Sequence, residues 1–332
     1  MENSQELSVR FWGVRGSYPA PGPDTIHVGG NTPCVEVRAG RQVLILDAGT
    51  GIIALGRSLL QRSAAAGQPV AATLLFSHMH HDHTQGFPFF APAFVPTTRL
   101  HIFGPHTFER DLSQVLAQNM VPPVFPITLY DMSASKEIHA ISESSCLALS
   151  TQGGPPQQYP AGVHLPPAAD SDRLLVRALR SYAHPGGTLI YRIDWRGQSL
   201  VYATDTEGYS STDRRLADFA RGAGLLIHDA QYTQEHYLGQ GGGRRATQGW
   251  GHSTAEMACE VALAAGVERL ALFHHDPTYP DDEIERIEAA AAGRFPGAFA
   301  AREGQEISLP AALSERCRCL ETQPVLPALT GD

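Results

Sequence analysis

Cysteine is scarce in this chain of 332 residues, and its thiols are scattered. The chain contains only Cys34, Cys146, Cys259, Cys317 and Cys319. An odd number of cysteines with irregular spacing does not suggest the disulfide framework of a small secreted protein. Cys317 and Cys319 form a C-x-C without a matching second pair, which is not the usual pattern of a structural zinc site. Cys34 and Cys259 lie in apolar stretches, where we expect them to be core residues.

Long apolar runs are also missing from the sequence. No stretch approaches the roughly 18 apolar residues that a membrane-spanning helix needs. The N-terminal sequence MENSQELSVR lacks the apolar centre of a secretory signal peptide. We therefore expect a cytoplasmic protein with no membrane partner.

Positive charge is the third shortage. The chain has 25 Lys and Arg residues against 34 Asp and Glu residues, which gives a formal net charge of −9. It therefore lacks the basic surface by which general nucleic-acid-binding proteins attract phosphate backbones. We expect a small-molecule substrate, and the charge balance argues against a nucleic-acid partner. An anionic substrate would have to be attracted by a local site.

Histidine, in contrast, is concentrated in one segment, which reads His-Met-His-His-Asp-His over residues 78–83. The segment follows the apolar run Ala-Thr-Leu-Leu-Phe-Ser at 72–77. This pattern is typical of a buried strand that ends in a loop. Imidazole and carboxylate groups together suit zinc, manganese or iron. A histidine-rich surface loop is the alternative, but a solvated loop has no reason to follow a buried strand. The segment therefore predicts a metal site.

The spacing H-x-H-x-D-H resembles the signature of the metallo-β-lactamase superfamily of metallohydrolases. The resemblance implies that His78 and His80 hold one metal ion, and that Asp82 and His83 help to hold a second. His81 occupies a variable position of the signature and is not expected to be a ligand. The implied cofactors are two divalent metal ions, with zinc as the first choice and manganese or iron as alternatives.

Three more ligands are implied by the same resemblance, each placed after a strand-like run. His184 would complete the first metal site, Asp205 would bridge the two metals, and His274 would complete the second site. His275 is the alternative to His274, which is preferred because it directly follows the apolar run at 270–273. A single histidine or aspartate at a strand end is often structural. The resemblance therefore rests on the order of the three residues along the chain, which is histidine, then aspartate, then histidine.

Strand-like and helix-like patterns alternate along the chain, which predicts an α/β protein. Strands are expected at 9–12, 34–37, 43–46, 73–76, 100–103, 174–182, 188–193, 200–203, 225–227 and 270–273. Helices are expected at 52–66, 212–221, 254–265 and 282–293. The resemblance implies a more specific fold, a four-layer αβ/βα sandwich with two facing sheets and the metals at one edge.

We expect one hydrolase domain over residues 1–310 and a loosely held C-terminal tail over 311–332. Regular patterns weaken over residues 105–172, where proline and glycine are frequent. This middle segment is either a lid or substrate-binding insertion, or a long surface connection between two αβ halves.

The sequence Gly-His-Ser-Thr-Ala-Glu at 251–256 resembles the phosphodiesterase branch of the superfamily, which includes the tRNA 3′-processing endonuclease and cyclic-phosphate phosphodiesterases. The resemblance implies that His252 is a general acid, since a leaving alkoxide needs a proton and imidazole titrates near neutral pH. Asp82 and Asp205 are the other predicted catalytic residues. The structural alternative is a capping box, in which Ser253 and a later glutamate open the helix at 254–265.

Segments at 11–17, 29–34, 47–51 and 225–230 resemble the same branch. Within them, Asp47 either forms hydrogen bonds that hold the segment 78–83, here called the metal loop, or caps a strand-to-helix turn.

The tRNA-processing enzymes of this branch carry a long arm between the third histidine of site one and the bridging aspartate. In this chain, His184 and Asp205 are separated by a stretch that a hairpin can fill. We therefore predict a dinuclear metal-dependent hydrolase that acts on a small or cyclic phosphodiester through a metal-bridging hydroxide. A lactonase, thioesterase or β-lactamase-type hydrolase on the same scaffold is the alternative. A homodimer is the general expectation for an oligomer.

Overall fold

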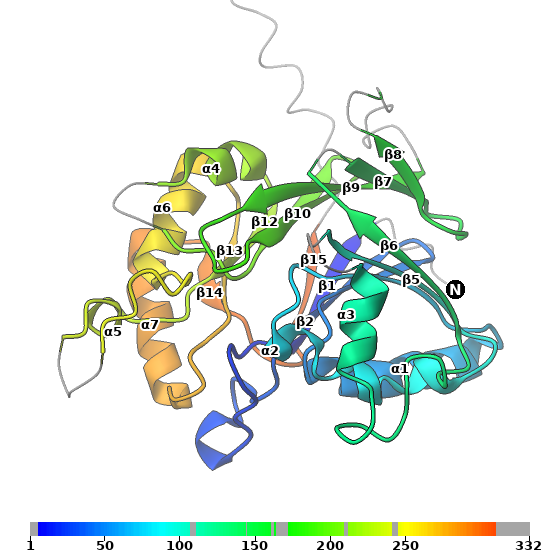
Figure 1. The fold of residues 1–332 in the computed structure, drawn as a ribbon. Helices are drawn as coiled ribbons and strands as arrows, with labels where there is room; N and C mark the ends of the chain where they lie inside the picture. Colours follow the sequence, from blue (N-terminus) through cyan, green and yellow to red (C-terminus); the bar gives the residue numbers. More distant parts are fainter. Residues whose placement is uncertain are drawn as a thin grey trace, which may run out of the picture.

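The computed structural model describes residues 6–106, 111–143, 145–160, 163, 172–208, 212–240 and 245–309. Two β-sheets face each other and helices cover their outer faces (Figure 1). The predicted α/β class and the sandwich of two facing sheets are therefore confirmed. The tail predicted at 311–332 lies outside the described residues, as do Cys317 and Cys319.

The first sheet has the strand order β15-β1-β2-β3-β4-β5-β6. Its strands are β1 (Leu7–Gly13), β2 (Cys34–Ala39), β3 (Gln42–Leu46), β4 (Ala71–Leu75), β5 (Arg99–Pro105), β6 (Ser135–Ile141) and β15 (Glu306–Leu309). The strands from β3 to β6 pair in parallel. Parallel neighbours need a crossover connection, and helix α1 (Gly51–Ala66) supplies the one between β3 and β4.

The second sheet has the order β14-β13-β12-β11-β10-β9-β7-β8. Its strands are β7 (Ser145–Ser150), β8 (Gln157–Pro160), β9 (Arg173–Ser181), β10 (Thr188–Trp195), β11 (Gln198–Ala203), β12 (Leu225–Asp229), β13 (Leu270–Phe273) and β14 (Ala298–Ala300). The strands from β11 to β14 pair in parallel.

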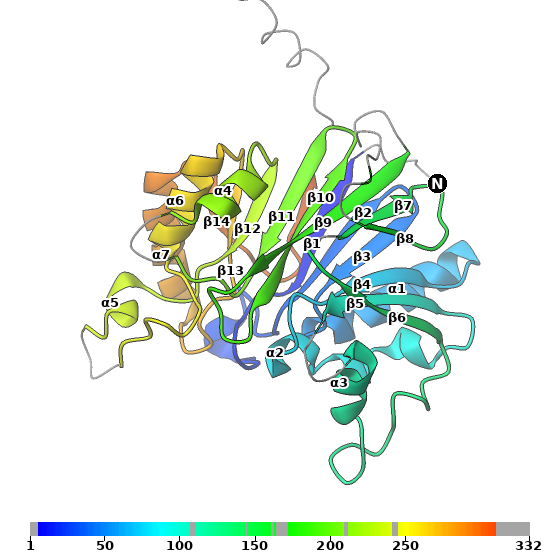
Figure 2. The ribbon, with the colours of Figure 1, turned by 45° about the horizontal axis from the view of Figure 1, so that its top comes forward.

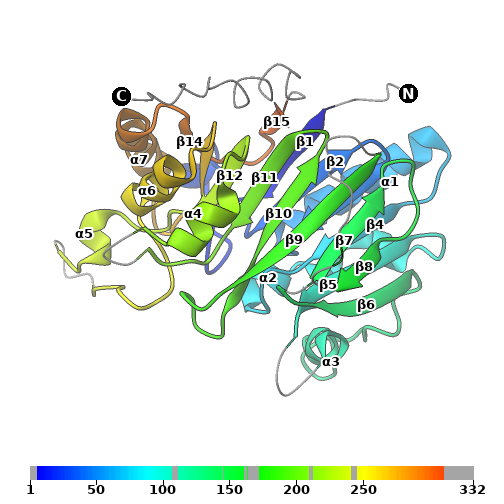
Figure 3. The same ribbon diagram turned by 90° about the horizontal axis from the view of Figure 1, so that it is seen from above.

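Helices α4 (Arg214–Ala220), α6 (Ala255–Ala265) and α7 (Asp281–Arg294) lie on one side of the molecule, opposite α1 and α3 (Leu112–Gln118) (Figure 3). The short elements are α2 (His81–Thr84), α5 (Gln234–Tyr237), η1 (Pro23–Thr25), η2 (Phe87–Phe89) and η3 (Ala91–Phe94). Among the helices of the described ranges, none is long and apolar enough to cross a membrane.

The middle segment of the chain is built into both sheets. Strand β6 extends the first sheet beside β5, whereas β7 and β8 extend the second sheet beside β9. Helix α3 packs on β5 and β6. The segment thus connects the two halves by continuing their sheets, and its role as a lid stays a prediction.

The core has two parts, and strand β3 separates them. Leu44 and Leu46 point into the apolar layer between the sheets, while Ile45 points into the layer under α1. This alternation follows from the two-residue period of a strand. Because both faces of β3 are covered, its sequence Gln-Val-Leu-Ile-Leu is apolar almost throughout. Cys34 and Cys259 are buried, as predicted.

Helix α6 begins one residue later than the predicted capping box. Thr254 is the N-cap, and its hydroxyl accepts a hydrogen bond from the backbone N–H of Met257. The prediction that Ser253 caps this helix is therefore wrong. The Ser253 hydroxyl donates to the carbonyl of Thr206 and accepts from the N–H of Gly208, which leaves the capping position to its neighbour.

The layer between the sheets should dominate stability. We predict that Leu44→Ala lowers the free energy of unfolding by about 2–5 kcal/mol, because Leu44 is fully buried and its loss leaves a cavity. The matched control is Leu263→Ala on α6, where the side chain is 59% exposed and the change should stay within about 0.5 kcal/mol. Urea unfolding followed by circular dichroism measures both, and equal effects would contradict this account of the core.

Candidate metal centre

The predicted ligands all lie at one edge of the sandwich, where strands of both sheets end. The segment 78–83 follows β4, and its last part forms the single turn α2, which lies between the two sheets (Figure 2). His184 lies in the connection from β9 to β10, Asp205 follows β11, and His274 follows β13. Because carboxyl ends of parallel strands meet at one edge of a sheet, residues distant in sequence become neighbours there.

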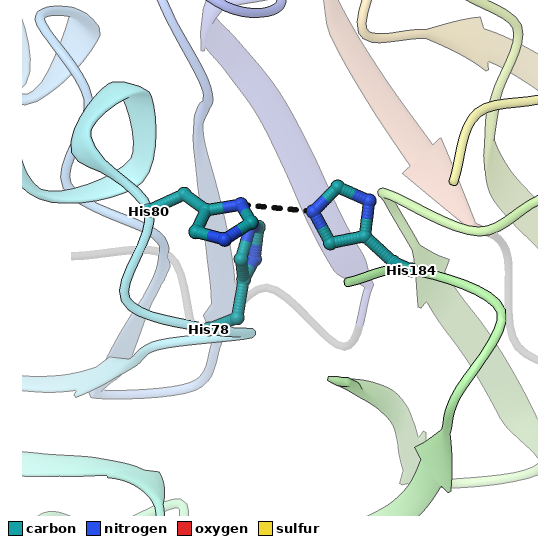
Figure 4. Close-up of side chains that lie close together, drawn as sticks. All are labelled: His78, His80 and His184. Carbon is teal, nitrogen blue, oxygen red and sulfur yellow. Dashed lines mark hydrogen bonds between the residues drawn. The ribbon is translucent and has the colours of Figure 1, made fainter. Parts of the chain in front are cut away.

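His78, His80 and His184 form the first group of side chains, and their facing nitrogen atoms lie within 4.8 Å of one another. Figure 4 shows the three rings turned toward a common point, with His80 Nδ1 2.8 Å from His184 Nε2. The Nε2 atom of His78 is buried and has no hydrogen-bond partner. An unpaired buried lone pair is costly, so this atom points to a missing positive partner.

The other ring nitrogens of this group fix which atoms face the centre. The Ser77 hydroxyl donates to Asp47 Oδ2 at 2.7 Å, so its oxygen can accept from His78 Nδ1 at 3.0 Å. His184 Nδ1 donates to the carbonyl of Gly251 at 3.2 Å. Burial lowers the pKa of His78 well below its usual value and that of His184 to about 4. Neutral imidazoles oriented in this way suit a divalent cation.

Asp82, His83, Asp205 and His274 form the second group, and their ligand atoms also lie within 4.8 Å of one another. His274 Nε2 lies 3.2 Å from Asp82 Oδ2 and 3.3 Å from His83 Nε2. Burial alone would raise the pKa of Asp82, but the neighbouring imidazoles of His83 and His274 hold it well below its usual range. The neighbouring imidazoles likewise hold the pKa of Asp205 well below its usual range, so both carboxylates are charged, which also suits a metal ion.

Asp205 lies between the two groups. Its Oδ1 atom is 3.7 Å from His78 Nε2 and 3.8 Å from His184 Nε2. Its Oδ2 atom is 3.1 Å from His83 Nε2 and 3.3 Å from His274 Nε2. One oxygen therefore faces each group, which is the geometry that a bridging carboxylate requires.

The two other histidines of these segments lie away from the groups. His275 is buried, and its Nε2 atom donates to the carbonyl of Ala301 at 3.1 Å. Burial, with a contribution from Arg15, lowers the pKa of His275 to about 3. His81 is exposed. The structure thus places His274, and neither of these two, among the candidate ligands.

Asp47 holds the metal loop, as one of the two interpretations of the sequence predicted. It is fully buried, and its carboxylate accepts hydrogen bonds from the backbone and hydroxyl of Ser77, both at 2.7 Å. It also accepts from His83 Nδ1 and from the hydroxyl of Tyr202, both at 2.8 Å. Tyr202 belongs to β11, so this carboxylate joins the loop to the opposite sheet. No sequence pattern pointed to Tyr202.

Gln231 and the N-terminal loop support the second group. Gln231 Oε1 accepts from His274 Nδ1 at 3.0 Å, and the backbone N–H of Ser17 donates to Asp82 Oδ2 at 2.8 Å. A side chain at Gly16 would lie 2.4 Å from the His274 ring, so only glycine allows this close approach. No sequence pattern pointed to Gln231, although it follows β12 by two residues.

The predicted acid, His252, lies beside both groups. Its ring stacks on that of His274 with centroids 5.0 Å apart, and its Nδ1 atom donates to Asp229 Oδ2 at 2.8 Å. Asp229 is itself held by the backbone N–H groups of Ser253 and Gln231. Burial disfavours the charged imidazole, but the carboxylate of Asp229 outweighs it and raises the pKa of His252 to about 9.

Asp229 is a functional candidate that sequence analysis missed. It ends β12, the strand between those that lead to Asp205 and His274, so its place at a strand end was the available signal. Asp229 and His252 group with Asp205 and His274 within 4.8 Å, so the pair lies at the second candidate metal site itself.

The comparisons with known proteins agree with this geometry. The sequence profile described as "Beta-lactamase superfamily domain" matches residues 41–275. The chain belongs to the beta-lactamase superfamily. The expected membership, in its metallo-β-lactamase phosphodiesterase branch, is confirmed.

Relatives of this superfamily member match most of its length. Ribonuclease Z of Mycobacterium avium is 28% identical over an alignment of 297 residues that covers 84% of this chain and 90% of that protein. Ribonuclease Z of Pyrococcus horikoshii is 24% identical over an alignment of 301 residues that covers 84% of this chain and 89% of that protein. The metallo-β-lactamase fold protein YhfI of Bacillus subtilis has a TM-score of 0.61 at 18% identity, covering 92% of this chain and 100% of that one. That structural likeness shows the fold.

Glu207 is a further residue that the sequence did not reveal. Its buried carboxylate accepts from the N–H groups of Gly249 and Gly251, both at 2.8 Å, and from the hydroxyl of Tyr237 at 2.7 Å. The carbonyl of Gly251 receives His184 Nδ1, and His252 follows directly. Glu207 therefore fixes the loop that orients both histidines.

The carboxylate of Asp47 should be required for tight metal binding. We predict that Asp47→Asn weakens zinc binding by about 10- to 100-fold, because the amide cannot accept the same four hydrogen bonds. Competition with a chromophoric chelator measures the affinity. His81→Ala, on the same loop but exposed, is the control and should bind as the wild type does. A correctly folded Asp47→Asn protein with wild-type zinc affinity would contradict this role.

Proposed function

We propose that this superfamily member hydrolyses a small or cyclic phosphodiester with two divalent metal ions, and that His252 protonates the leaving oxygen. Hydrolysis of a phosphodiester is supported by the relatives named ribonuclease Z, which are matched over 89–90% of their length. The chain is accordingly a metal-dependent hydrolase of phosphodiester bonds. The observation that carries the proposed role of His252 as the acid is its pairing with Asp229 beside the two groups of ligands.

The ligand groups fit two cations, with zinc as the first choice and manganese or iron as alternatives. One ion would be held by His78, His80 and His184, the other by Asp82, His83 and His274, with Asp205 between them. Cations bound there would polarise a phosphoryl oxygen and lower the pKa of a water toward neutrality. The carboxylates of Asp82 and Asp205 contribute by fixing the positions at which this chemistry occurs.

His252 is suited to the proton-transfer step. Its Nδ1–H is given to Asp229, which leaves Nε2 as the atom that carries the proton to the leaving oxygen. The negative charge of Asp229 stabilises the protonated ring before transfer. Since Asp229 is anchored by two backbone N–H groups, it also fixes the direction of the imidazole.

The short connection between His184 and Asp205 supports a small substrate. It consists of β10, a tight turn at Arg196 and Gly197, and β11, with Trp195 paired to Gln198. No arm of the tRNA-gripping type is therefore present between these two described residues. The expectation that excluded nucleic acid is nevertheless not supported, because the relatives are named ribonuclease Z. A short RNA therefore stands as the competing substrate.

The proposed acid can be tested by varying the leaving group. We predict that His252→Ala lowers kcat/KM by about 10²- to 10⁴-fold on a thymidine dinucleotide, whose leaving alkoxide needs a proton. The loss should be far smaller on bis(p-nitrophenyl) phosphate, because p-nitrophenolate leaves without one. His139→Ala, an exposed histidine of β6, is the control and should behave as the wild type does.

The outcomes separate the parts of the proposal. Equal losses on the two substrates would show that His252 is not the acid. Absence of turnover on both, from protein that holds two metal ions, would contradict the phosphodiesterase function. Lactones and thioesters would then be the substrates to examine.

A further inference from the structure

A cavity of about 320 Å³ lies beside the turn that carries His184. It is lined by Leu179, Arg180, Ser181, Tyr182, Ala183, Asp213 and Arg215. These residues belong to the end of β9, to the turn that carries His184, and to the start of α4. Tyr182 precedes His184 by two residues, which is at most about 7 Å of extended chain. A ligand in this cavity could therefore extend to the metal centre.

Two guanidinium groups line the cavity, although the chain has a formal net charge of −9. Arg180 Nη2 donates to the carbonyl of Gly186 at 2.9 Å, while its buried Nε atom has no partner. Arg215 Nη2 lies 3.2 Å from Glu143 Oε2, and these two side chains are 61% and 50% exposed. Exposed ion pairs contribute little, so an anion can replace Glu143.

The two acidic side chains beside the cavity accept hydrogen bonds from backbone N–H groups. Asp213 caps α4 by accepting from the N–H of Leu216, and Glu143 also accepts from the backbone N–H of Arg180 at 3.0 Å. Guanidinium groups suit phosphate because their planar N–H donors match its oxygens. The two guanidinium groups thus supply N–H donors for a phosphate group, although Asp213 and Glu143 offset their charge.

An aromatic surface accompanies these cations. The side chain of Tyr182 is 77% exposed, and the guanidinium of Arg180 lies 5.6 Å from its ring centre. With one face of the ring occupied by Arg180 and most of the side chain in solvent, the opposite face is open. Nucleobases stack on exposed aromatic rings beside cationic side chains.

We propose that this cavity is a substrate subsite for a nucleotide that carries a second phosphate. The nucleobase would stack on Tyr182, the second phosphate would contact Arg180 and Arg215, and the scissile diester would lie at the metal centre. The inference rests on the proposed function and narrows its substrates to nucleotide phosphodiesters with a further phosphate group.

Binding of two product-like probes to the zinc-loaded full chain tests the subsite. Isothermal titration calorimetry should give thymidine 3′,5′-bisphosphate an affinity about tenfold or more above that of thymidine 5′-monophosphate. Arg215→Gln should remove most of this advantage. Arg177→Gln is the matched control, since this exposed β9 arginine pairs with Asp194 and does not line the cavity.

Stacking is tested separately at Tyr182. Tyr182→Ala should weaken both probes by about five- to hundredfold, whereas Tyr182→Phe, which keeps the ring, should retain the wild-type affinity. Equal affinities of the wild type for the two probes, or an unchanged advantage in Arg215→Gln, would overturn the phosphate subsite. A Tyr182→Ala protein that binds both probes with the wild-type affinity would overturn the proposed stacking.

Failure of the proposed phosphodiesterase function can be distinguished from failure of the subsite. Hydrolysis of bis(p-nitrophenyl) phosphate by the wild type, measured beside the titrations, tests that function without the subsite. Absent hydrolysis with selective bisphosphate binding would contradict the phosphodiesterase and keep the subsite. Hydrolysis without selective binding would keep the phosphodiesterase and remove the subsite.

Discussion

The burial of negative charge at one edge of the sandwich is the constraint on which the rest depends. Asp47, Asp82, Asp205 and Asp229 are all buried there, and in the described parts of the chain their ion pairs are with histidines alone. Buried carboxylates need a positive partner, because their removal from water costs several kcal/mol per ion, to order of magnitude. The protonated ring of His252 balances the charge of Asp229, and two divalent cations would balance the charge of the other carboxylates.

The fold makes this arrangement of charge tolerable. Each candidate ligand follows a strand, so its backbone is fixed by the sheet before its side chain reaches the centre. A second layer of hydrogen bonds, from Asp47, Gln231 and Glu207, then sets the ring orientations. Tyr202 and Ser77 meet on one carboxylate although they come from opposite sheets, so the position of the metal loop and the packing of the sandwich depend on each other.

The sequence predicted what is encoded locally. The spacing of residues 78–83 and the histidine or aspartate after each apolar run were visible without a structure, as was the α/β alternation. The hydrogen bonds that hold these residues in place were not visible. Tyr202 bonds to a carboxylate 155 positions away, and Glu207 bonds to a loop more than 40 positions away. Strands β6 to β8 were missed because β6 alternates partly exposed positions with few apolar ones. The cap of α6 differed by one residue, since Ser253 and Thr254 can both cap.

The metal content of the protein tests the central claim most directly. The wild type would be loaded with zinc, dialysed and measured by inductively coupled plasma mass spectrometry, with His184→Ala beside it. The account predicts two zinc ions per wild-type chain and the loss of one in the variant, because His184 belongs to the first group of ligands and not to the second. A wild-type chain that is folded but retains no zinc would contradict it.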